Sequence, residues 1–429
     1  FSSRRRHTRF RNVTGVQTCA LPISDSIHFD YVLERLTRPA LAAGYRLMEL
    51  PIFEDTELFT RGVGESTDVV TKEMYTFEDR AGRSLTLRPE GTAGVMRSVI
   101  EHGLDRGQLP LKVFYRGPFF RAERPQAGRY RQFYQFGIEA IGVIDPYLDV
   151  EVISIADQGI RSLGLRDFTL QITSLGDTAS RDAHRKELVS FITKLPLDDE
   201  TRQRASRNPL RLFDDKRESI REMMELAPRL LDFLTSESLK HFDQVQRILK
   251  ENAIAFEVNP KMVRGLDYYT GTTFEFVHHK LGAQSGIGGG GRYDGLMEVL
   301  GGSALSGIGF GLGIDRIILA MQEEKVLPTN IGYLDLYVIG LGEAGRTRAF
   351  SLVADVRRQG FVADLAFGER ALKGAMKGAD RLGARFVLVI GEDEVTSGSG
   401  ELKDLSSGQT HSVTLASLAS SLASLSRNT

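Results

Sequence analysis

The sequence predicts a protein of the α/β class with two domains. The first is a large α+β domain built on an antiparallel sheet with a helical insertion, and the second is a small α/β domain. Short strand-like runs separated by Gly, Pro or Asp predominate from Thr71 to Ile141, which favours an antiparallel sheet. Residues 176–255 are charged and helix-favouring, as in an inserted helical subdomain. After Pro328, apolar strand-like runs alternate with helical stretches, which is typical of a mostly parallel sheet.

The elements of the large domain are expected in the following order. A helix over 27–43 has apolar residues on one face and a kink at Pro39, and a strand edge at 46–50 then runs into Pro51. After the insertion, the chain returns to strand at 266–277, and a Gly-rich strand leads into an apolar helix over 314–321. The strands of the first half are expected at 74–77, 84–87, 112–115, 119–121 and 130–138.

The small C-terminal domain alternates strand and helix. Its tail, from Leu415 onward, is either a last short helix or a fraying end. Lys373, Lys377 and Arg381 recur every four residues and therefore share one helix face. That face is either an ordinary solvated surface or a nucleic-acid contact, and the spacing does not decide between them. Strands are expected at 334–339, 362–365 and 386–390, with helices at 343–358 and 370–382.

The composition is that of an ordinary globular protein and excludes several classes. Of the 429 residues, 41% are hydrophobic and 26% are charged. No run approaches the ~18 apolar residues of a membrane span. The single cysteine, Cys19, cannot form an internal disulfide, and the eight His are scattered, so neither a disulfide framework nor a structural zinc site is expected. With a net charge of −1, any nucleic-acid surface must be a local patch.

The first 24 residues differ in character from the rest. They hold five Arg and the only Cys but no Asp or Glu, and the character changes abruptly at Asp25. Three interpretations stay open: adapter or junction sequence fused to a truncated gene, a mitochondrial transit peptide, or a disordered basic arm. We favour the first, so residues 1–24 do not enter the functional argument. Without them the chain is distinctly acidic.

The densest chemical feature is an arginine-rich segment. Five Arg fall within the sixteen residues 116–131, with Gly, Pro and aromatic residues between them. An antiparallel hairpin with such a loop can direct several guanidinium groups at one polyanion, and an aromatic ring between them can stack on a base. The segment is therefore either a solvated basic hairpin or, as we favour, a triphosphate site.

Three further segments are weaker evidence for a functional site when each is taken by itself. Residues 263–271 place one Arg and two Tyr beside glycines, which suits a small polar pocket. Residues 286–294 form either a flexible turn or a place where the backbone approaches something closely, and they match neither a P-loop nor a dinucleotide-binding fingerprint. Residues 307–316 deliver an Arg at the start of a helix, which helix packing alone does not explain.

Together these segments resemble the histidyl-tRNA synthetase family, which belongs to the class II aminoacyl-tRNA synthetases, over about residues 31–414. Motif 2 alone indicates only class II, whereas the arginine-led peptide that ends in two tyrosines is typical of the histidine enzymes. The resemblance implies a class II catalytic domain at 25–327 with an insertion at about 176–255, and an anticodon-binding domain at 328–429. The matching segments are Leu87–Ala93, Arg121–Phe133 (motif 2), Arg264–Tyr269 and Gly311–Arg316 (motif 3).

The resemblance implies that the protein converts histidine and ATP to histidyl-adenylate and pyrophosphate, and then transfers histidine to the 3′ end of tRNA(His). Mg²⁺ would accompany ATP, with no tightly bound cofactor and no protein-held metal. The first step needs no general base because the amino-acid carboxylate is already ionised; it needs charge stabilisation at the α-phosphorus. Arg121 and Arg264 would be the catalytic residues that grip the α-phosphate, and Arg264 would stand where many relatives place a metal ion.

The other implied roles follow position by position. Glu90, Thr92 and Gln135 would bind the histidine ammonium, while the rest of the histidine set would line the imidazole end. The implied ATP-binding residues are Arg121, Glu123, Arg129, Phe133 and Arg316; the histidine-binding residues are Glu90, Thr92, Gln135, Glu139, Tyr268, Tyr269 and Tyr293; and the tRNA-binding residues are Arg124 and Gln126.

Two other functions remain as alternatives. The inactive regulatory subunit of ATP phosphoribosyltransferase resembles these enzymes but lacks their anticodon-binding domain, and the second domain together with Glu90, Arg129 and Arg264 argues against it. A domain that senses uncharged tRNA would require losses in the histidine pocket that the sequence does not show. We further expect a cytoplasmic homodimer with no membrane association. The family usually begins with a short Gly-containing segment near the active site and dimer interface, and residues 1–24 stand in its place.

Overall fold

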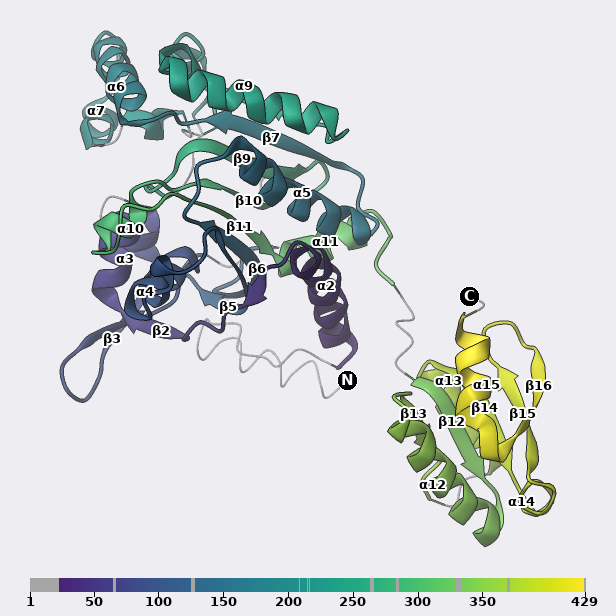
Figure 1. Ribbon diagram of the computed structural model, residues 1–429. Coiled ribbons are helices and arrows are strands. Elements are labelled where there is room, and N and C mark those ends of the chain that lie inside the picture. The colour runs from purple at the N-terminus through teal and green to yellow at the C-terminus, as the bar shows by residue number, and fades with distance from the viewer. Residues whose placement is uncertain are drawn as a thin grey trace. The chain divides into compact units, whose positions relative to one another are not determined.

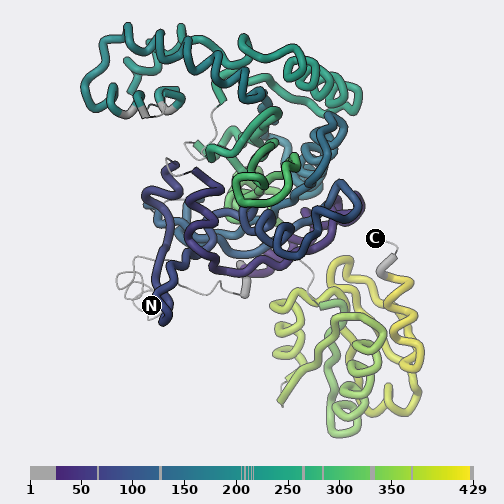
Figure 2. The backbone as a smooth tube through the Cα atoms, turned by 60° about the vertical axis from the view of Figure 1, so that its left-hand side comes forward, coloured from purple at the N-terminus to yellow at the C-terminus, as the bar shows by residue number. Residues whose placement is uncertain are grey.

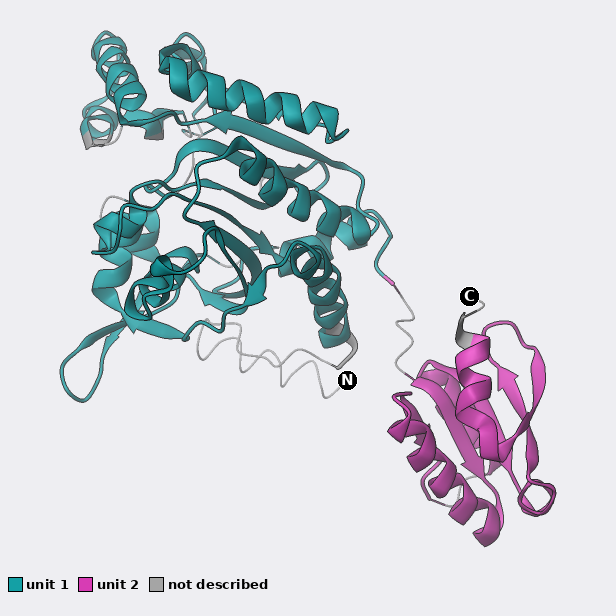
Figure 3. Ribbon diagram, viewed as in Figure 1, with its two compact units in different colours: residues 1–327 teal, residues 328–429 magenta. Residues whose placement is uncertain are grey.

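The chain forms two compact units, one that ends at Leu327 and one that begins at Pro328 (Figure 3). Residues 1–22 lie outside the part of the chain that the structure describes. No helix within that part is both long and apolar enough to span a bilayer. The structure is a computed structural model, and it describes residues 23–64, 67–124, 128–207, 209–213, 215, 217–262, 266–282, 285–328, 334–368 and 371–427.

The larger unit is built on an eight-stranded sheet (Figure 1). Neighbouring strands from β5 to β7 in the sheet order run antiparallel, while β1 and β8 pair in parallel at the two edges. The predicted antiparallel sheet is thus confirmed. The strands predicted at 112–115 and 119–121 are one continuous strand, β5. In sheet order the strands are β1 (Arg46–Leu47), β5 (Leu111–Phe120), β6 (Gln132–Ile141), β11 (Gly307–Gly313), β10 (Gly286–Arg292), β9 (Thr270–His278), β7 (Phe168–Ser174) and β8 (Glu257–Val258).

One face of this sheet is covered by helices and forms the main core. Because side chains alternate between the faces of a strand, Phe136 and Ile138 of β6 point into this core, where Leu36, Ile153 and Phe242 of three different helices meet them. Their burial supplies the main hydrophobic stabilisation of the unit. The covering helices are α2 (Ile23–Ala42, with Pro39 inside it), α5 (Pro146–Ser162), α9 (Ser236–Glu251) and α11 (Ile314–Glu323).

The other face carries a second, three-stranded sheet and short helices. Val95, Met96 and Val99 of one of these helices pack against Val113 and Tyr115 of β5. This packing places the start of that helix, α4, above the strands of the main sheet. The elements are β2 (Phe53–Asp55), β4 (Ser84–Leu87), β3 (Tyr75–Glu78), α3 (Thr56–Val63), η1 (Val69–Glu73), α4 (Thr92–Glu101), η2 (Leu104–Arg106) and α10 (Leu296–Val299).

The Gly-rich segment at 286–291 is a strand within the sheet, β10, and is not a turn. It is glycine-rich because neighbouring strands leave no room for side chains. A Cβ at Gly290 would overlap the carbonyl oxygen of Gly309, and a Cβ at Gly291 would overlap Thr273. Of the two sequence interpretations, the close backbone approach is therefore the right one.

The helical insertion predicted at 176–255 follows β7, and its helices lie together at one end of the larger unit (Figures 1 and 2). Its first helices form a small core of their own around Leu188, Leu212 and Ile220. Its last helix, α9, instead packs on α5 and belongs to the main core. The insertion comprises α6 (Thr178–Thr193), α7 (Asp199–Arg207), η3 (Pro209–Leu212), α8 (Glu218–Met224), η4 (Leu230–Phe233) and α9.

The C-terminal unit has a five-stranded sheet of its own. Its first three strands in sheet order are parallel, as the alternation of strand and helix predicts, and an antiparallel pair, β15 and β16, extends one edge. The tail from residue 415 is helical. The elements are β13 (Ala363–Leu365), β12 (Leu334–Gly340), β14 (Ala384–Ile390), β15 (Ser399–Asp404), β16 (Thr410–Thr414), α12 (Gly342–Arg358), α13 (Leu372–Arg381), α14 (Glu392–Ser397), η6 (Leu415–Ser417) and α15 (Leu418–Arg427).

Candidate active site

A cavity of about 360 Å³ opens on the face of the main sheet opposite its helix-covered core. The backbones of β10 and β11 form part of its lining, and the hairpin of β5 and β6 contributes side chains from the alternate positions Phe133 and Gln135. The predicted site residues that line it are Glu90, Thr92, Arg121, Glu123, Arg129, Phe133, Gln135, Tyr268, Tyr269, Tyr293 and Arg316.

One end of the cavity concentrates positive charge. Burial lowers the pKa of Arg316, and the neighbouring guanidinium groups of Arg121 and Arg129 lower it further. Burial also lowers the pKa of Arg121. Three cations so close in a partly desolvated space repel one another, and a polyanionic ligand would relieve that repulsion.

Backbone carbonyls and a ring hold these arginines in place. Arg121 Nε donates to the Pro89 carbonyl oxygen at 3.0 Å, and its guanidinium carbon lies 5.3 Å from the centre of the Phe133 ring. Arg316 donates from Nε to the Gly128 oxygen at 2.9 Å and from Nη1 to the Gly286 oxygen at 2.7 Å. The two guanidinium groups are thus oriented without a ligand.

Arg129 is held differently, by carboxylates. It forms an ion pair with Glu123 and lies 3.8 Å from Glu73, measured from Nη2 to the Glu73 carboxylate. Its side chain is 37% exposed, so these pairs are screened by solvent. An incoming phosphate would therefore compete with Glu123 for this guanidinium.

The start of α4 brings a buried carboxylate to the cavity. Glu90 accepts from the backbone N–H groups of Thr92 at 2.7 Å and Ala93 at 2.9 Å, and so caps a helix whose N-cap residue is a glycine. The Tyr268 hydroxyl donates to it at 3.3 Å. Burial nevertheless raises the pKa of Glu90. A cationic ammonium group is the ligand that this carboxylate fits.

Glu139 lies behind the cavity lining, only 1% exposed, and accepts three hydroxyl groups. Thr92 donates to Oε1 at 2.8 Å, Tyr115 donates to Oε1 at 3.3 Å, and Tyr293 donates to Oε2 at 2.7 Å. Burial raises the pKa of Glu139 to about 8, while the hydroxyl groups of Tyr293 and Thr92 oppose the rise. The carboxyl group of the empty cavity is therefore mostly protonated at neutral pH.

The aromatic residues close this end of the cavity. Tyr268 and Tyr269 both line it, so neither belongs to the core alone, and their ring centres are 4.8 Å apart. Tyr115 is a residue that the sequence reasoning missed: it is fully buried on β5 and touches Glu139. The signal that points to it is its position on β5, two residues from Gly117 in a strand whose alternate side chains face this side.

Some predicted residues lie outside the described part of the chain or away from this cavity. Arg264 and Gln126 lie outside the described residues. Arg124 is described and exposed, next to the end of β5, and does not line the cavity. The predicted face of Lys373, Lys377 and Arg381 exists on α13, with all three side chains exposed. Whether these residues touch RNA stays a prediction.

No cluster of three or more His, Cys, Asp or Glu side chains with metal-binding geometry occurs among the residues that the structure describes. Glu275 of β9 does line the cavity, near Arg316. A single carboxylate together with phosphate oxygens would give Mg²⁺ oxygen ligands of the kind it prefers.

The fold and the cavity together are those of a class II aminoacyl-tRNA synthetase: an antiparallel sheet with an arginine-bearing hairpin and a further arginine at the start of a helix. A family model described as histidyl-tRNA synthetase matches residues 24–317, and one described as anticodon binding domain matches residues 335–425. The chain belongs to the histidyl-tRNA synthetase family. The family and the fold class predicted from the sequence are therefore confirmed.

Individual relatives agree with this assignment. A histidine–tRNA ligase of Saccharopolyspora erythraea is 59% identical over 391 residues, which cover 91% of this chain and 93% of the relative. One of Nocardia farcinica is 60% identical over 390 residues, with 91% and 92% covered. The crystal structure of apo S. aureus histidyl-tRNA synthetase matches with a TM-score of 0.76 and 36% identity, covering 94% of this chain and 98% of that one. The regulatory-subunit alternative has no support, since the anticodon-binding match lies in the second unit that such a subunit lacks.

Proposed function

We propose that this chain is a histidine–tRNA ligase that performs both half-reactions in the cavity described above. Its relatives carry that activity in their names. The observation that carries the proposal is the pair of environments in one cavity: Arg121, Arg129 and Arg316 line it close enough to influence one another, and its lining residues Thr92 and Tyr293 donate to the buried carboxylate of Glu139. A triphosphate and an imidazole need opposite environments of this kind.

In the first half-reaction, an oxygen of the histidine carboxylate attacks the α-phosphorus of ATP. The bond between the α-phosphorus and the bridging oxygen breaks, and pyrophosphate leaves with the electron pair. Arg121 would stabilise the charge on the α-phosphate, while Arg129 and Arg316 would hold the outer phosphates. Arg264 would share the work at the α-phosphate, and Phe133 would stack on adenine.

The amino acid would be oriented by both of its ends. Glu90, Thr92 and Gln135 would accept the ammonium group, since the Glu90 carboxylate is fixed on the helix start by two backbone N–H groups. Glu139 would accept an imidazole N–H, and Tyr293 would fix that carboxylate. A site that forms hydrogen bonds with both nitrogens of the imidazole ring rejects amino acids that lack such a ring, because the buried polar groups of the site would then be left unpaired.

The second half-reaction and the assembly are further parts of the proposal. The tRNA acceptor end would meet Arg124 and Gln126, and the C-terminal unit would bind the anticodon. ATP would enter with Mg²⁺, to which Glu275, one of the acidic residues that line the cavity, would offer an oxygen ligand. We propose that the protein is a homodimer and acts in the cytoplasm. Sedimentation of the purified protein would test the dimer directly.

The experiment that tests the activity is ATP–pyrophosphate exchange with each of the twenty amino acids in turn. We expect exchange with histidine and none above background with the others. Exchange stimulated by another amino acid but not by histidine would overturn the proposal. Charging of tRNA(His) but not of an unrelated tRNA would then test the second step.

A further inference from the structure

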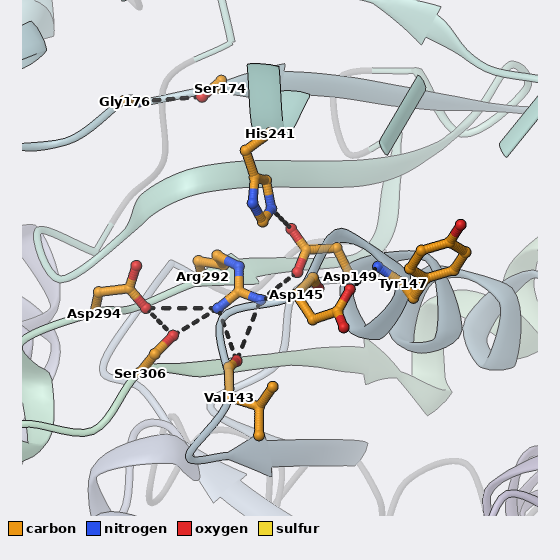
Figure 4. A network of polar contacts seen from close by, with 10 residues as sticks. All are labelled: Val143, Asp145, Tyr147, Asp149, Ser174, Gly176, His241, Arg292, Asp294 and Ser306. Atoms are coloured by element: carbon orange, nitrogen blue, oxygen red, sulfur yellow. Dashed lines mark hydrogen bonds and ion pairs between the residues drawn. The ribbon is translucent and has the colours of Figure 1, made fainter. Parts of the chain in front are cut away.

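A buried ion-pair network joins the end of β10 to α5 and α9, two of the helices that cover the main sheet (Figure 4). Its centre is Arg292, the last residue of β10, whose side chain is 2% exposed. Arg292 Nη2 lies 2.6 Å from Oδ1 of Asp149, which is on α5 and fully buried. The mechanism described above uses neither residue.

The network joins segments that are far apart in the sequence. His241 of α9, the last helix of the insertion, donates from Nε2 to Asp149 Oδ2 at 2.8 Å. Arg292 Nη1 donates to the Ser306 hydroxyl at 2.6 Å, and Nη2 donates to the Asp145 carbonyl oxygen at 3.3 Å. Figure 4 shows Asp149 and Ser306 contacting the Arg292 guanidinium, and His241 contacting Asp149 from its other side. The Asp149 carboxylate of α5 thus links His241 of the insertion to Arg292 of β10.

The residue that follows Arg292 is Tyr293, whose hydroxyl donates to Glu139 at 2.7 Å. Consecutive side chains of an extended chain point to opposite faces, so Arg292 reaches the helices while Tyr293 reaches the cavity. The Tyr293 ring also fills the space above Gly307, where a Cβ would overlap it. Any rotation or slip of the chain at Arg292 would therefore move the Tyr293 phenol relative to Glu139.

The backbone at this point is irregular and needs a fixed anchor. The pairing of β10 with β9 shifts register between Gly291 and Arg292, so that Arg292 pairs with Thr270. Gly271, with φ +44°, lies in the skipped stretch, and a Cβ there would approach Arg292 Cδ to 3.3 Å. Such irregularities re-aim side chains beside active sites. Buried ion pairs add little net stability but fix geometry, which suits an anchor.

We propose that Arg292, oriented by Asp149 and His241, is a positioning residue for histidine recognition, because it fixes the end of β10 so that the Tyr293 phenol meets Glu139. This inference rests on the proposed function. It assigns the last helix of the insertion a part in selecting the amino acid.

The test is ATP–pyrophosphate exchange by full-length variants, with the KM for histidine and the KM for ATP measured separately. Asp149→Asn is expected to raise the histidine KM about tenfold, the loss of roughly one well-placed hydrogen bond, and to leave the ATP KM within about twofold. The matched control is Asp157→Asn, which removes a buried, ion-paired carboxylate from the same helix but not from this network. The control is expected to leave both constants unchanged.

His241 supplies a rescue experiment at the outer end of the network, where the side chain is 19% exposed. His241→Leu removes the donor to Asp149 and should raise the histidine KM, whereas His241→Gln keeps an N–H donor and should restore it. If Asp149→Asn does not fold, this pair decides the question. Leu and Gln variants with equal histidine KM would overturn the inference.

A double-mutant cycle identifies the route. In a Tyr293→Phe background, which lacks the hydroxyl that reaches Glu139, Asp149→Asn should add less than about twofold to the histidine KM. If the effects of Asp149→Asn and Tyr293→Phe on the histidine KM are fully additive, or if the KM values for histidine and ATP rise equally, the network has a general packing role. Either result would overturn the inference. Absence of histidine-dependent exchange in the unaltered protein would instead refute the proposed function.

Discussion

Replacement of Glu139 by Gln is the most informative single change in the cavity, because it keeps the shape of the side chain and removes its charge. Glu139 is buried and accepts hydroxyl groups from Thr92, Tyr115 and Tyr293. In the proposed complex its carboxylate would also accept the imidazole N–H. A hydrogen bond to a charged group contributes about 1.5–3 kcal/mol, which corresponds to a roughly 10- to 150-fold rise in the histidine KM.

The pH dependence sharpens this prediction. Because burial raises the pKa of Glu139 to about 8, the empty cavity holds the neutral acid at pH 7, and histidine must bind at the expense of a proton. Ionisation becomes easier as the pH rises, so the advantage of Glu over Gln should grow up to about pH 8 and then level off. The titration of free histidine in solution is the same for both proteins and cancels in the ratio of the two KM values.

The assay is ATP–pyrophosphate exchange by both proteins from about pH 6 to pH 9, with histidine and ATP varied in turn. We expect a KM ratio for histidine that increases with pH and a KM ratio for ATP near one. A histidine ratio that is flat across this range, or an equal loss for ATP, would refute a role for the ionised Glu139 side chain in binding the imidazole.

The same pKa predicts an effect on stability of defined sign. The pKa of Glu139 is about 8 in the folded chain and near the ordinary glutamate value of 4.5 in the unfolded chain, so the folded state binds the proton more tightly. Its contribution to the free energy of unfolding is therefore fully present below about pH 4.5 and is lost as the pH rises to about 8. The Tm of Glu139→Gln, relative to that of the unaltered protein, should rise between about pH 5 and pH 8.5. A Tm difference independent of pH would contradict the assignment.

Three other changes test separate parts of the account. Gly290→Ala would force a Cβ into the Gly309 carbonyl and should lower the free energy of unfolding by about 3 kcal/mol or more in denaturant titration, whereas Gly374→Ala, on an open face of α13, should be neutral or stabilising by up to about 1 kcal/mol. Arg264→His should slow adenylate formation about 10²–10³-fold with a much smaller change in the histidine KM, and should affect transfer from preformed adenylate less; equal slowing of both steps would indicate misfolding. Deletion of residues 328–429 should spare exchange and weaken tRNA charging, and charging at the full rate would rule out anticodon binding by this unit.

The sequence was sufficient for the family, the fold class and many of the polar side chains that line the cavity, because the motifs that carry the resemblance are local in the chain. Alternation and turn residues predicted the hairpin that carries Arg121 and Phe133, and a glycine-to-helix transition predicted the place of Arg316. Contacts between segments that are distant in the sequence could not be predicted. The strand nature of residues 286–292 depends on neighbours that exclude a Cβ, and glycine by itself favours turns.

The residues that the sequence did not reveal share one physical property: their partners are distant in the chain. Tyr115 matters through Glu139, and Arg292 matters through Asp149 and His241. No spacing rule relates Arg292 to a carboxylate on one helix and an imidazole on another. Buried polar groups of this kind become visible only when the partners that satisfy them are known.

The glycine strands have a consequence for inhibition. Where β10 and β11 line the cavity, at Gly288 and Gly309, a ligand meets main-chain atoms that no substitution can remove. A side chain introduced at Gly288 would overlap Leu312, and one at Gly309 would overlap the Glu139 carboxylate, so a change that expels the ligand also displaces one of these buried side chains. A compound that draws its affinity from these two backbones would therefore leave few viable substitutions that confer resistance, unlike one that depends on the partly exposed Arg129 side chain.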